Sequence, residues 1–291
     1  MAEDVSINFD TLISPETVIE PNSIVEAKAY KVCIDWITGE YGLAFRMDEC
    51  LPVTRDNVYA MAELQGDVAK VLLRLRHMCD NHKNLRDNLG LDQGENGALW
   101  QALFGNYEDS VLNRLHPNKR GDAYNSLLGP ISVLTFCDLM QKADPELFKK
   151  LNPLKIIASA EDDVERKIDL VLDFGTKNKD GKKVLRVVQL KTDRYMLPGV
   201  KRIDPENVKS EYLDGVLDAR EARTMLGGAR YLEGLLDAEL RCFVALVPAF
   251  DARVCNNPLG ILNNSYDAVE GAREFIQNAR KEGLIPKRKK R

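Results

Sequence analysis

The segment Leu154–Asp193, LKIIASAEDDVERKIDLVLDFGTKNKDGKKVLRVVQLKTD, decides how the fold is interpreted. It contains three short apolar runs, at 154–160, 167–174 and 183–191, and a loop of Gly, Lys, Asn and Asp separates the last two. Apolar, β-branched runs bounded by turn-forming residues are typical of neighbouring strands. The segment therefore predicts three strands of one sheet, with an acidic turn between the first two.

Polar side chains interrupt these predicted strands. Asp169 stands inside the second run, and Gln189 and Lys191 close the third. Charged groups in a buried strand are costly unless they are paired or bind a metal. Strand side chains alternate between the two faces of a sheet, so Gln189 and Lys191 are expected on one face and Leu190 on the other. The acidic turn adds Glu161, Asp162, Asp163 and Glu165.

Composition limits the class of protein. The chain has 291 residues, of which 44% are hydrophobic and 30% charged, and its net charge is −4. These values predict one large or two smaller domains, and nucleic-acid contact, if any, through local basic patches. The six cysteines show no close pairing, the first residues do not resemble a signal peptide, and no apolar run approaches about 18–20 residues. We expect a soluble, intracellular, cytoplasmic protein without membrane contact.

Apolar periodicity divides the chain into three parts. We expect a mostly helical N-terminal domain at 1–116, a core at 117–255, and a C-terminal helix with a basic tail at 256–291. The segment after Ser23 is either a helix or a helix that runs into a strand. A strand is predicted at 242–250. Helices are predicted at 56–84, 98–115, 122–142, 206–239 with a break near Gly227–Gly228, and 266–281.

The order of these elements, a helix, three strands, a helix and a strand, is an αβββαβ arrangement. Together with Asp169 and the run Gln189-Leu190-Lys191, it resembles the core of the PD-(D/E)XK nuclease superfamily. In that family an Asp opens the second core strand, and the third carries an acid or Gln, one intervening residue and a Lys. The resemblance covers about residues 120–250. It implies an α/β (α+β) fold with a restriction-endonuclease-like core, and Mg²⁺- or Mn²⁺-dependent endo- or exonuclease activity, with DNA as the expected substrate.

The chemistry of phosphodiester hydrolysis gives each of these residues a role. Mg²⁺ prefers hard oxygen ligands, and Asp169 would be the central one. Gln189 could orient a ligand or water through its amide oxygen, and the carbonyl of Leu190 is a further possible ligand. Lys191 could position the attacking water or stabilise charge that develops on the phosphate.

A second acid is needed because Gln189 supplies no negative charge. The acidic turn contains the candidates, since the end of the first predicted strand faces the start of the second. Asp163 is favoured and Glu161 is next, with Glu165 also available.

Two basic regions are candidates for phosphate contact. Arg220 and Arg223 lie on the predicted helix 206–239, and they could line a groove beside the sheet or form a solvated face paired with Asp218 and Glu221. Lys287 and Arg288 belong to the tail PKRKKR, which could bind phosphates through counterion release, stay solvated, or act as a localisation signal.

Other interpretations stay open at this point. Asp169 and Lys191 could form an ordinary cross-strand ion pair beneath a solvated acidic turn. The same fold could be a catalytically inactive module that binds nucleic acid or a protein partner, or a purely structural protein. A protein partner would be expected at the N-terminal helices. The sequence leaves the oligomeric state open.

Overall fold

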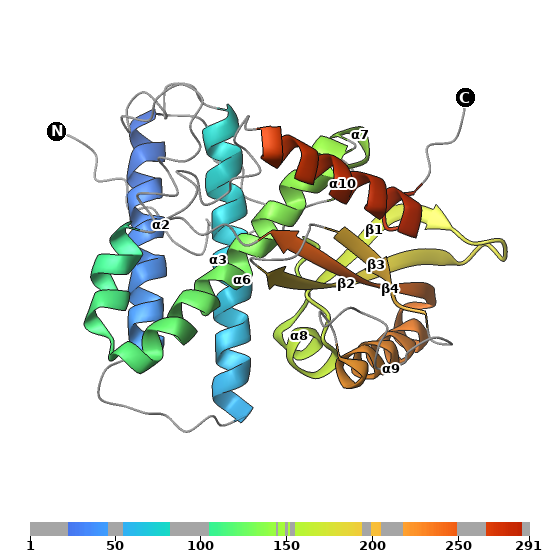
Figure 1. Ribbon diagram of the computed structural model, residues 1–291, viewed down its shortest axis with the longest axis horizontal. Helices are drawn as coiled ribbons and strands as arrows, with labels where there is room; N and C mark the ends of the chain where they lie inside the picture. The colour runs from blue at the N-terminus through green and yellow to red at the C-terminus, as the bar shows by residue number, and fades with distance from the viewer. Residues whose placement is uncertain are drawn as a thin grey trace.

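A computed structural model describes residues 23–45, 55–81, 105–143, 145–148, 151, 155–193, 199–204, 218–248 and 266–286. In these ranges the chain is a mixed α/β protein, with helices around one four-stranded sheet (Figure 1). None of the described helices is long and apolar enough to cross a bilayer. The principal helices are α2 (Ser23–Ala44), α3 (Arg55–Asn81), α6 (Pro117–Ala143), α7 (Pro145–Phe148), α8 (Ala160–Arg166), α9 (Ala219–Leu236) and α10 (Tyr266–Glu282), and η1 (Leu112–Arg114) is a single 3₁₀ turn.

The sheet has the strand order β1-β2-β4-β3. Its central strands β2 and β4 are parallel, whereas β1 and β3 pair antiparallel at the two edges. A parallel pair needs a crossover connection, and α9 lies between β2 and β4 in the chain. The strands are β1 (Leu170–Lys177), β2 (Lys183–Asp193), β3 (Gly199–Arg202) and β4 (Ala238–Pro248). β3 was not predicted, because it lies in a polar stretch and pairs only with β4.

The first predicted strand, at 154–160, is reduced to a single antiparallel bridge beside β1. Of the residues described there, only Ile157 forms a bridge, to Leu170, and the chain then enters α8. Ser159 caps this helix, since its hydroxyl accepts a hydrogen bond from the backbone N–H of Asp162 at 3.1 Å. Acids in a first helical turn are stabilised by the free N–H groups and the helix dipole. The predicted acidic turn is therefore a helix, and three of its four acids, Glu161, Asp162 and Asp163, lie in the first helical turn.

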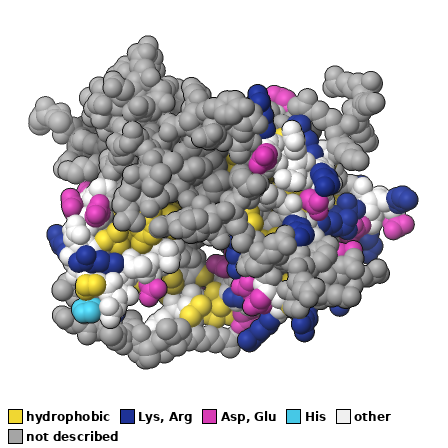
Figure 2. Space-filling model, in the orientation of Figure 1, with side chains coloured by type: hydrophobic (Ala, Val, Ile, Leu, Met, Phe, Trp, Pro, Cys, Tyr) yellow, Lys and Arg dark blue, Asp and Glu magenta, His cyan; other side chains and the backbone are white. Residues whose placement is uncertain are grey.

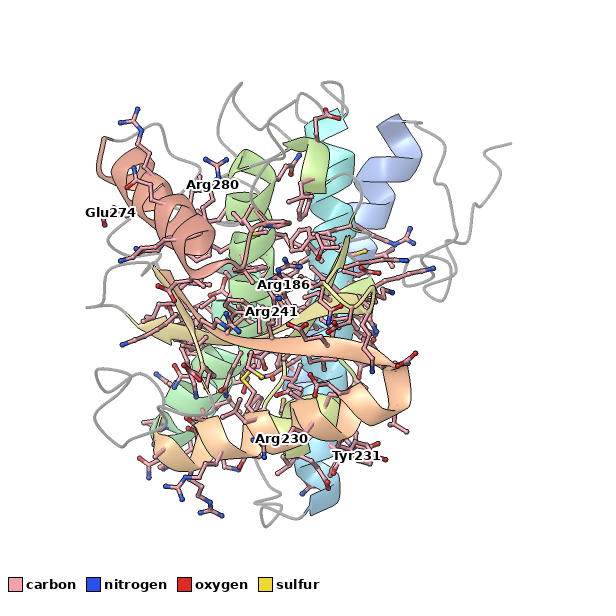
Figure 3. The ribbon with its side chains drawn as sticks, turned by 90° about the vertical axis from the view of Figure 1, so that its right-hand side faces the viewer. Arg186, Arg230, Tyr231, Arg241, Glu274 and Arg280 are labelled. Carbon is pink, nitrogen blue, oxygen red and sulfur yellow. The ribbon has the colours of Figure 1, made fainter. Side chains whose placement is uncertain are left out.

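Helices cover both faces of the sheet (Figure 3), with α10 on one side of β4 and α9 on the other. On the α6 and α10 side the core includes Val188 and Phe243, and Phe136 of α6 packs edge-to-face on Phe275 of α10. On the α9 side, Met225 is buried in a second cluster. The strand residues of that cluster include Leu185, Val187, Cys242 and Val244.

The helices before residue 117 share the core of the sheet. α3 packs against α6 and also against α8, while α2 packs against α3. One buried cluster contains Ile37 of α2, Leu72 of α3, Leu127 of α6 and Phe243 of β4. The expected domain boundary at 116 falls just before α6, and this cluster continues across it. The segment after Ser23, left open between two interpretations, is a helix.

The predicted break at Gly227–Gly228 is wrong, because α9 is continuous through both glycines. Gly228 instead lies where α9 approaches α8 closely. A Cβ atom at this position would lie 2.6 Å from Cβ and 2.8 Å from Cγ of Arg166 on α8. The guanidinium of Arg166 then lies over the ring of Tyr231, 4.8 Å from its centroid. Gly228 thus allows α9 to pack closely on α8, the helix that carries the acidic cluster.

Candidate active site

Lys167, whose backbone has the left-handed helical conformation, joins α8 to β1. Lys167 has φ 56° and ψ 45°, and its N–H closes the end of α8 on the carbonyl oxygens of Asp162 and Asp163. A residue other than Gly, Asn or Asp is uncommon in this region. The tight turn brings Asp169 back beside α8 after only two residues. The backbone of Asp169 then joins the sheet, since its N–H donates to the carbonyl of Val188 at 2.9 Å.

Two carboxyl groups meet at this turn. The side chains of Asp163 and Asp169 are hydrogen-bonded to each other. Part of the Asp169 residue remains accessible, but protein atoms crowd its carboxyl group. This burial, and next the negative charge of Asp163, raise the pKa of Asp169 to about 8. Burial also raises the pKa of Asp163, against the opposing hydrogen bond from Asp169 and the charge of Lys167. The pair therefore retains a proton at neutral pH in the metal-free protein.

The neighbouring strand holds Asp169 in place. The backbone N–H of Leu190 donates to Asp169 Oδ2 at 2.5 Å, which opposes the rise in the pKa of Asp169. Leu190 itself points to the α6 side, where it packs against the main core. Its two neighbours along β2 therefore point to the α9 side, as the alternation of strand side chains predicts.

Gln189 is the buried polar member of this group. Its side chain is only 5% exposed, and its Oε1 has no hydrogen-bond partner within the part of the chain that the structure describes. A buried acceptor without a partner is rare and costs about 1–3 kcal/mol. Gln189 thus offers an oxygen ligand on β2, next to the residue whose N–H contacts Asp169.

Lys191 is held by Glu221, an acid whose expected partners were the arginines of its own helix. Its Nζ lies 2.9 Å from Oε1 of Glu221, in the first turn of α9, and both side chains are 29% exposed. Asp218 caps this turn by accepting from the N–H groups of Arg220 and Glu221, each at 2.7 Å. Lys191 also lowers the pKa of Asp169, in a minor way. The acid that Lys191 pairs with at 2.9 Å is thus Glu221, and not Asp169 as in the alternative interpretation of a cross-strand ion pair.

The other acids of the cluster lie elsewhere. Glu161 and Asp162 both bind Arg166, at 2.8 Å each, and Glu165 accepts a hydrogen bond from Tyr59 of α3. Among the candidate second acids, Asp163 is the one that the structure brings to Asp169.

The predicted phosphate-binding residues lie on the exposed surface of α9 or outside the described residues. Arg220 and Arg223 are exposed on α9, and Arg223 Nε donates to the carbonyl of Ala219 at 3.0 Å. Lys287 and Arg288 fall beyond the described ranges.

The donor set fits a magnesium ion better than a metal held by protein ligands alone. Among the described residues there is no group of three or more His, Cys, Asp or Glu side chains that could hold a metal. Mg²⁺, however, is usually held by one or two carboxylates together with water and substrate phosphate. Asp163 and Asp169 supply two carboxylates, and Gln189 Oε1 and the carbonyl of Leu190 supply neutral oxygens.

No protein-family model, curated protein or solved structure matches the chain.

Proposed function

We propose that this protein is a metal-dependent nuclease with a restriction-endonuclease-like core, which hydrolyses phosphodiester bonds, with DNA as the expected substrate. The observation that carries the proposal is the contact between the carboxyl groups of Asp163 and Asp169, at the strand that presents Gln189 and Lys191. The parallel β2–β4 pair, joined through α9, and the β1–β2 hairpin agree with this assignment.

The proposed site has two parts, a set of metal ligands and the ammonium group of Lys191. Asp169 and Asp163 would hold Mg²⁺ or Mn²⁺, with Gln189 Oε1 and the Leu190 carbonyl as further candidates. The bound ion would neutralise charge on the scissile phosphate. The Leu190 N–H keeps the Asp169 carboxyl oriented, and deprotonation of the pair prepares it to bind a cation.

Lys191 is the residue that we assign to the reacting phosphate or the attacking water. Its ammonium group is directed by the contact with Glu221 at 2.9 Å, so the group is positioned before substrate arrives. A positioned charge stabilises a developing negative charge without reorganisation during the reaction. Glu221 is then a positioning residue, since it acts through Lys191.

Cleavage of plasmid and single-stranded DNA by the purified full chain, with Mg²⁺ or Mn²⁺, tests the proposal. Lys191→Ala should lower the rate at least about 100-fold. Lys183→Ala is the matched control, because Lys183 lies at the opposite end of β2 and pairs with Asp173 at 2.7 Å. If the wild type and Lys191→Ala are equally inert on DNA and RNA, the enzyme proposal is wrong. Salt-dependent DNA binding without cleavage would then indicate the inactive binding module.

A further inference from the structure

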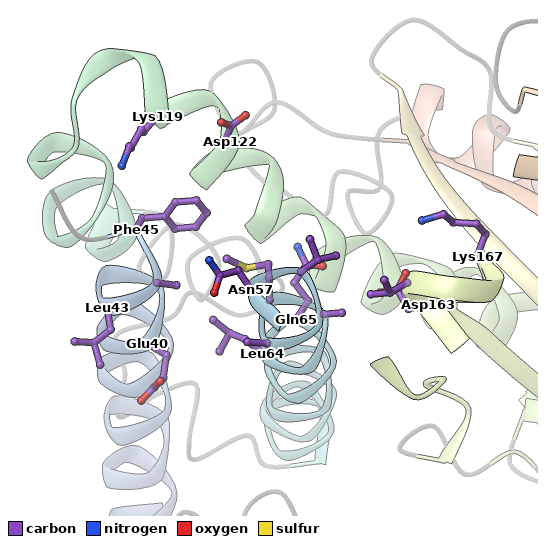
Figure 4. A pocket seen from close by; sticks show the side chains of 16 residues that line it. Glu40, Leu43, Phe45, Asn57, Leu64, Gln65, Lys119, Asp122, Asp163 and Lys167 are labelled. Carbon is purple, nitrogen blue, oxygen red and sulfur yellow. The ribbon is translucent and has the colours of Figure 1, made fainter. Parts of the chain in front are cut away.

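A cavity of about 790 Å³ opens between α2, α3, the start of α6 and α8. Its volume is in the range of roughly 300–1,000 Å³ that is typical of ligand sites. Figure 4 shows Phe45, Asn57 and Gln65 around this space, with Asp163 and Lys167 on the side of the sheet. The space-filling view is hollowed in the same region, between the N-terminal helices and the sheet (Figure 2).

The cavity is continuous with the proposed metal site through one side chain. Asp163 lines the cavity and also makes the hydrogen bond with Asp169. A ligand with a phosphate at the two carboxyl groups would therefore place its adjoining part in the cavity.

The lining selects against a second phosphate. Its charged side chains are the carboxylates of Glu40, Asp122 and Asp163 and the ammonium groups of Lys119 and Lys167. Because Asp163 belongs to the carboxyl pair that holds a proton, the other two acids and the two lysines balance, and an anion inside the cavity would find no excess positive charge. The remaining walls are largely apolar, and they include Val58, Met61 and Leu64. The lining suits a flat, uncharged group with a polar edge.

We propose that this cavity holds one unstacked base of a single-stranded nucleic acid, next to the phosphate at Asp163 and Asp169. The inference rests on the proposed nuclease function, and it names the substrate class. Phe45 provides an aromatic face for stacking, and Asn57 and Glu40 provide amide and carboxylate groups that can bind base edges. A base in a duplex would first have to leave its stack, so single strands bind more tightly than duplexes.

Fluorescence anisotropy with the full chain tests this proposal. The probe is a fluorescein-labelled single strand of about 15 nucleotides, compared with its duplex, with Ca²⁺ in place of Mg²⁺. The variant Phe45→Leu keeps an apolar side chain beside Tyr41 but removes the aromatic face. We expect about tenfold weaker single-strand binding, because stacking on one aromatic ring is worth about that factor. Leu235→Ala is the control, since Leu235 is 64% exposed on α9 and does not line the cavity.

Circular dichroism shows whether each variant folds. If Phe45→Leu does not fold, Asn57→Ala replaces it, with an expected loss of about fivefold. Equal affinity for single strand and duplex, or unchanged affinity in the folded variant, overturns the inference. Cleavage in Mg²⁺ is scored separately. If cleavage depends on Lys191 but binding does not depend on Phe45, the base-binding role of the cavity is refuted and the nuclease proposal stands. If binding depends on Phe45 but no cleavage occurs, the nuclease proposal is refuted and the base-binding role of the cavity stands.

Discussion

Replacing Asp169 by Asn tests the buried carboxyl pair without any assumption about activity. In the metal-free protein the pKa of Asp169 is about 8, whereas its ordinary value is 3.8. Between these values the folded chain holds a proton that the unfolded chain has released, so the free energy of unfolding falls as pH rises. Each pH unit in this window costs about 1.4 kcal/mol, which gives about 4 kcal/mol between pH 4 and pH 7.

An Asn side chain imitates the protonated acid and does not titrate. Its Oδ1 can accept from the Leu190 N–H, as Asp169 Oδ2 does, and its Nδ2 can donate to Asp163. The variant should therefore be more stable than the wild type at pH 7 and equal to it near pH 4. Because sites relax and admit water, we expect a measured gain of about 2 kcal/mol at pH 7.

Urea unfolding in EDTA at pH 4, 5.5, 7 and 8.5, followed by circular dichroism, measures this difference. Asp173→Asn is the matched control in β1. The ion pair with Lys183 lowers the pKa of Asp173, so its stabilisation is present above the ordinary pKa and is lost at low pH. That variant should lose less than about 1 kcal/mol at pH 7. If Asp169→Asn is destabilised at pH 7 and this loss becomes smaller as pH falls, Asp169 is an ionised, charge-paired group, and the description of the pair is wrong.

Three further predictions concern the surroundings of this pair. Mn²⁺ should raise the melting temperature of the wild type more at pH 8.5 than at pH 6.5, because binding displaces the shared proton. Mn²⁺ should leave the melting temperature of Asp169→Asn unchanged. An equal shift in both proteins would place the ion elsewhere. Glu221→Gln should slow cleavage about tenfold, because it releases Lys191. In a double-mutant cycle it should not lower the cleavage rate of Lys191→Ala any further. Additive losses of rate would show that Glu221 does not act through Lys191. Gly228→Ala should destabilise the fold by about 1–2 kcal/mol, since the clash with Arg166 exceeds the helix-propensity gain of about 1 kcal/mol. Gly227→Ala, whose Cβ would have no neighbour within 4 Å, should be stabilising; the opposite order by thermal melting would contradict the packing argument.

Strong local patterns predicted most of the described elements. α3 was expected at 56–84 and is Arg55–Asn81, and β2 and β4 follow the apolar runs that indicated them. A strand was predicted at 154–160 from the apolar run alone, although Ser159 in this run is the N-cap of α8. Ser159 and Asp162 have the spacing of a capping box, and the backbone N–H of Asp162 indeed donates to Ser159 Oγ at 3.1 Å. That signal was present in the sequence and would have predicted α8.

Parts of the site depended on tertiary packing and could not be predicted from local pattern. The alternation of strand residues was sufficient to place Gln189 and Lys191 on one face. The sequence favoured Asp163 over Glu161 on the expectation of a turn between two strands, whereas in the structure the two acids are separated because α8 is a helix in which Glu161 pairs with Arg166. Glu221 lies 30 residues beyond Lys191, and only the crossover through α9 brings the two together.

The packing of α3 on α8 bears on how the N-terminal helices relate to the proposed chemistry. Tyr59 donates a hydrogen bond to Glu165, and a Cβ at Gly66 would lie 3.8 Å from the Ile157 side chain, just before α8. α8 is only seven residues long, too short to be stable alone, so its position depends on these neighbours. Asp163 lies on this helix, two residues from the Tyr59 contact. A change in α3 that shifts α8 would therefore alter the Asp163–Asp169 contact and the cavity together. On this argument the N-terminal helices would support the proposed site through α8.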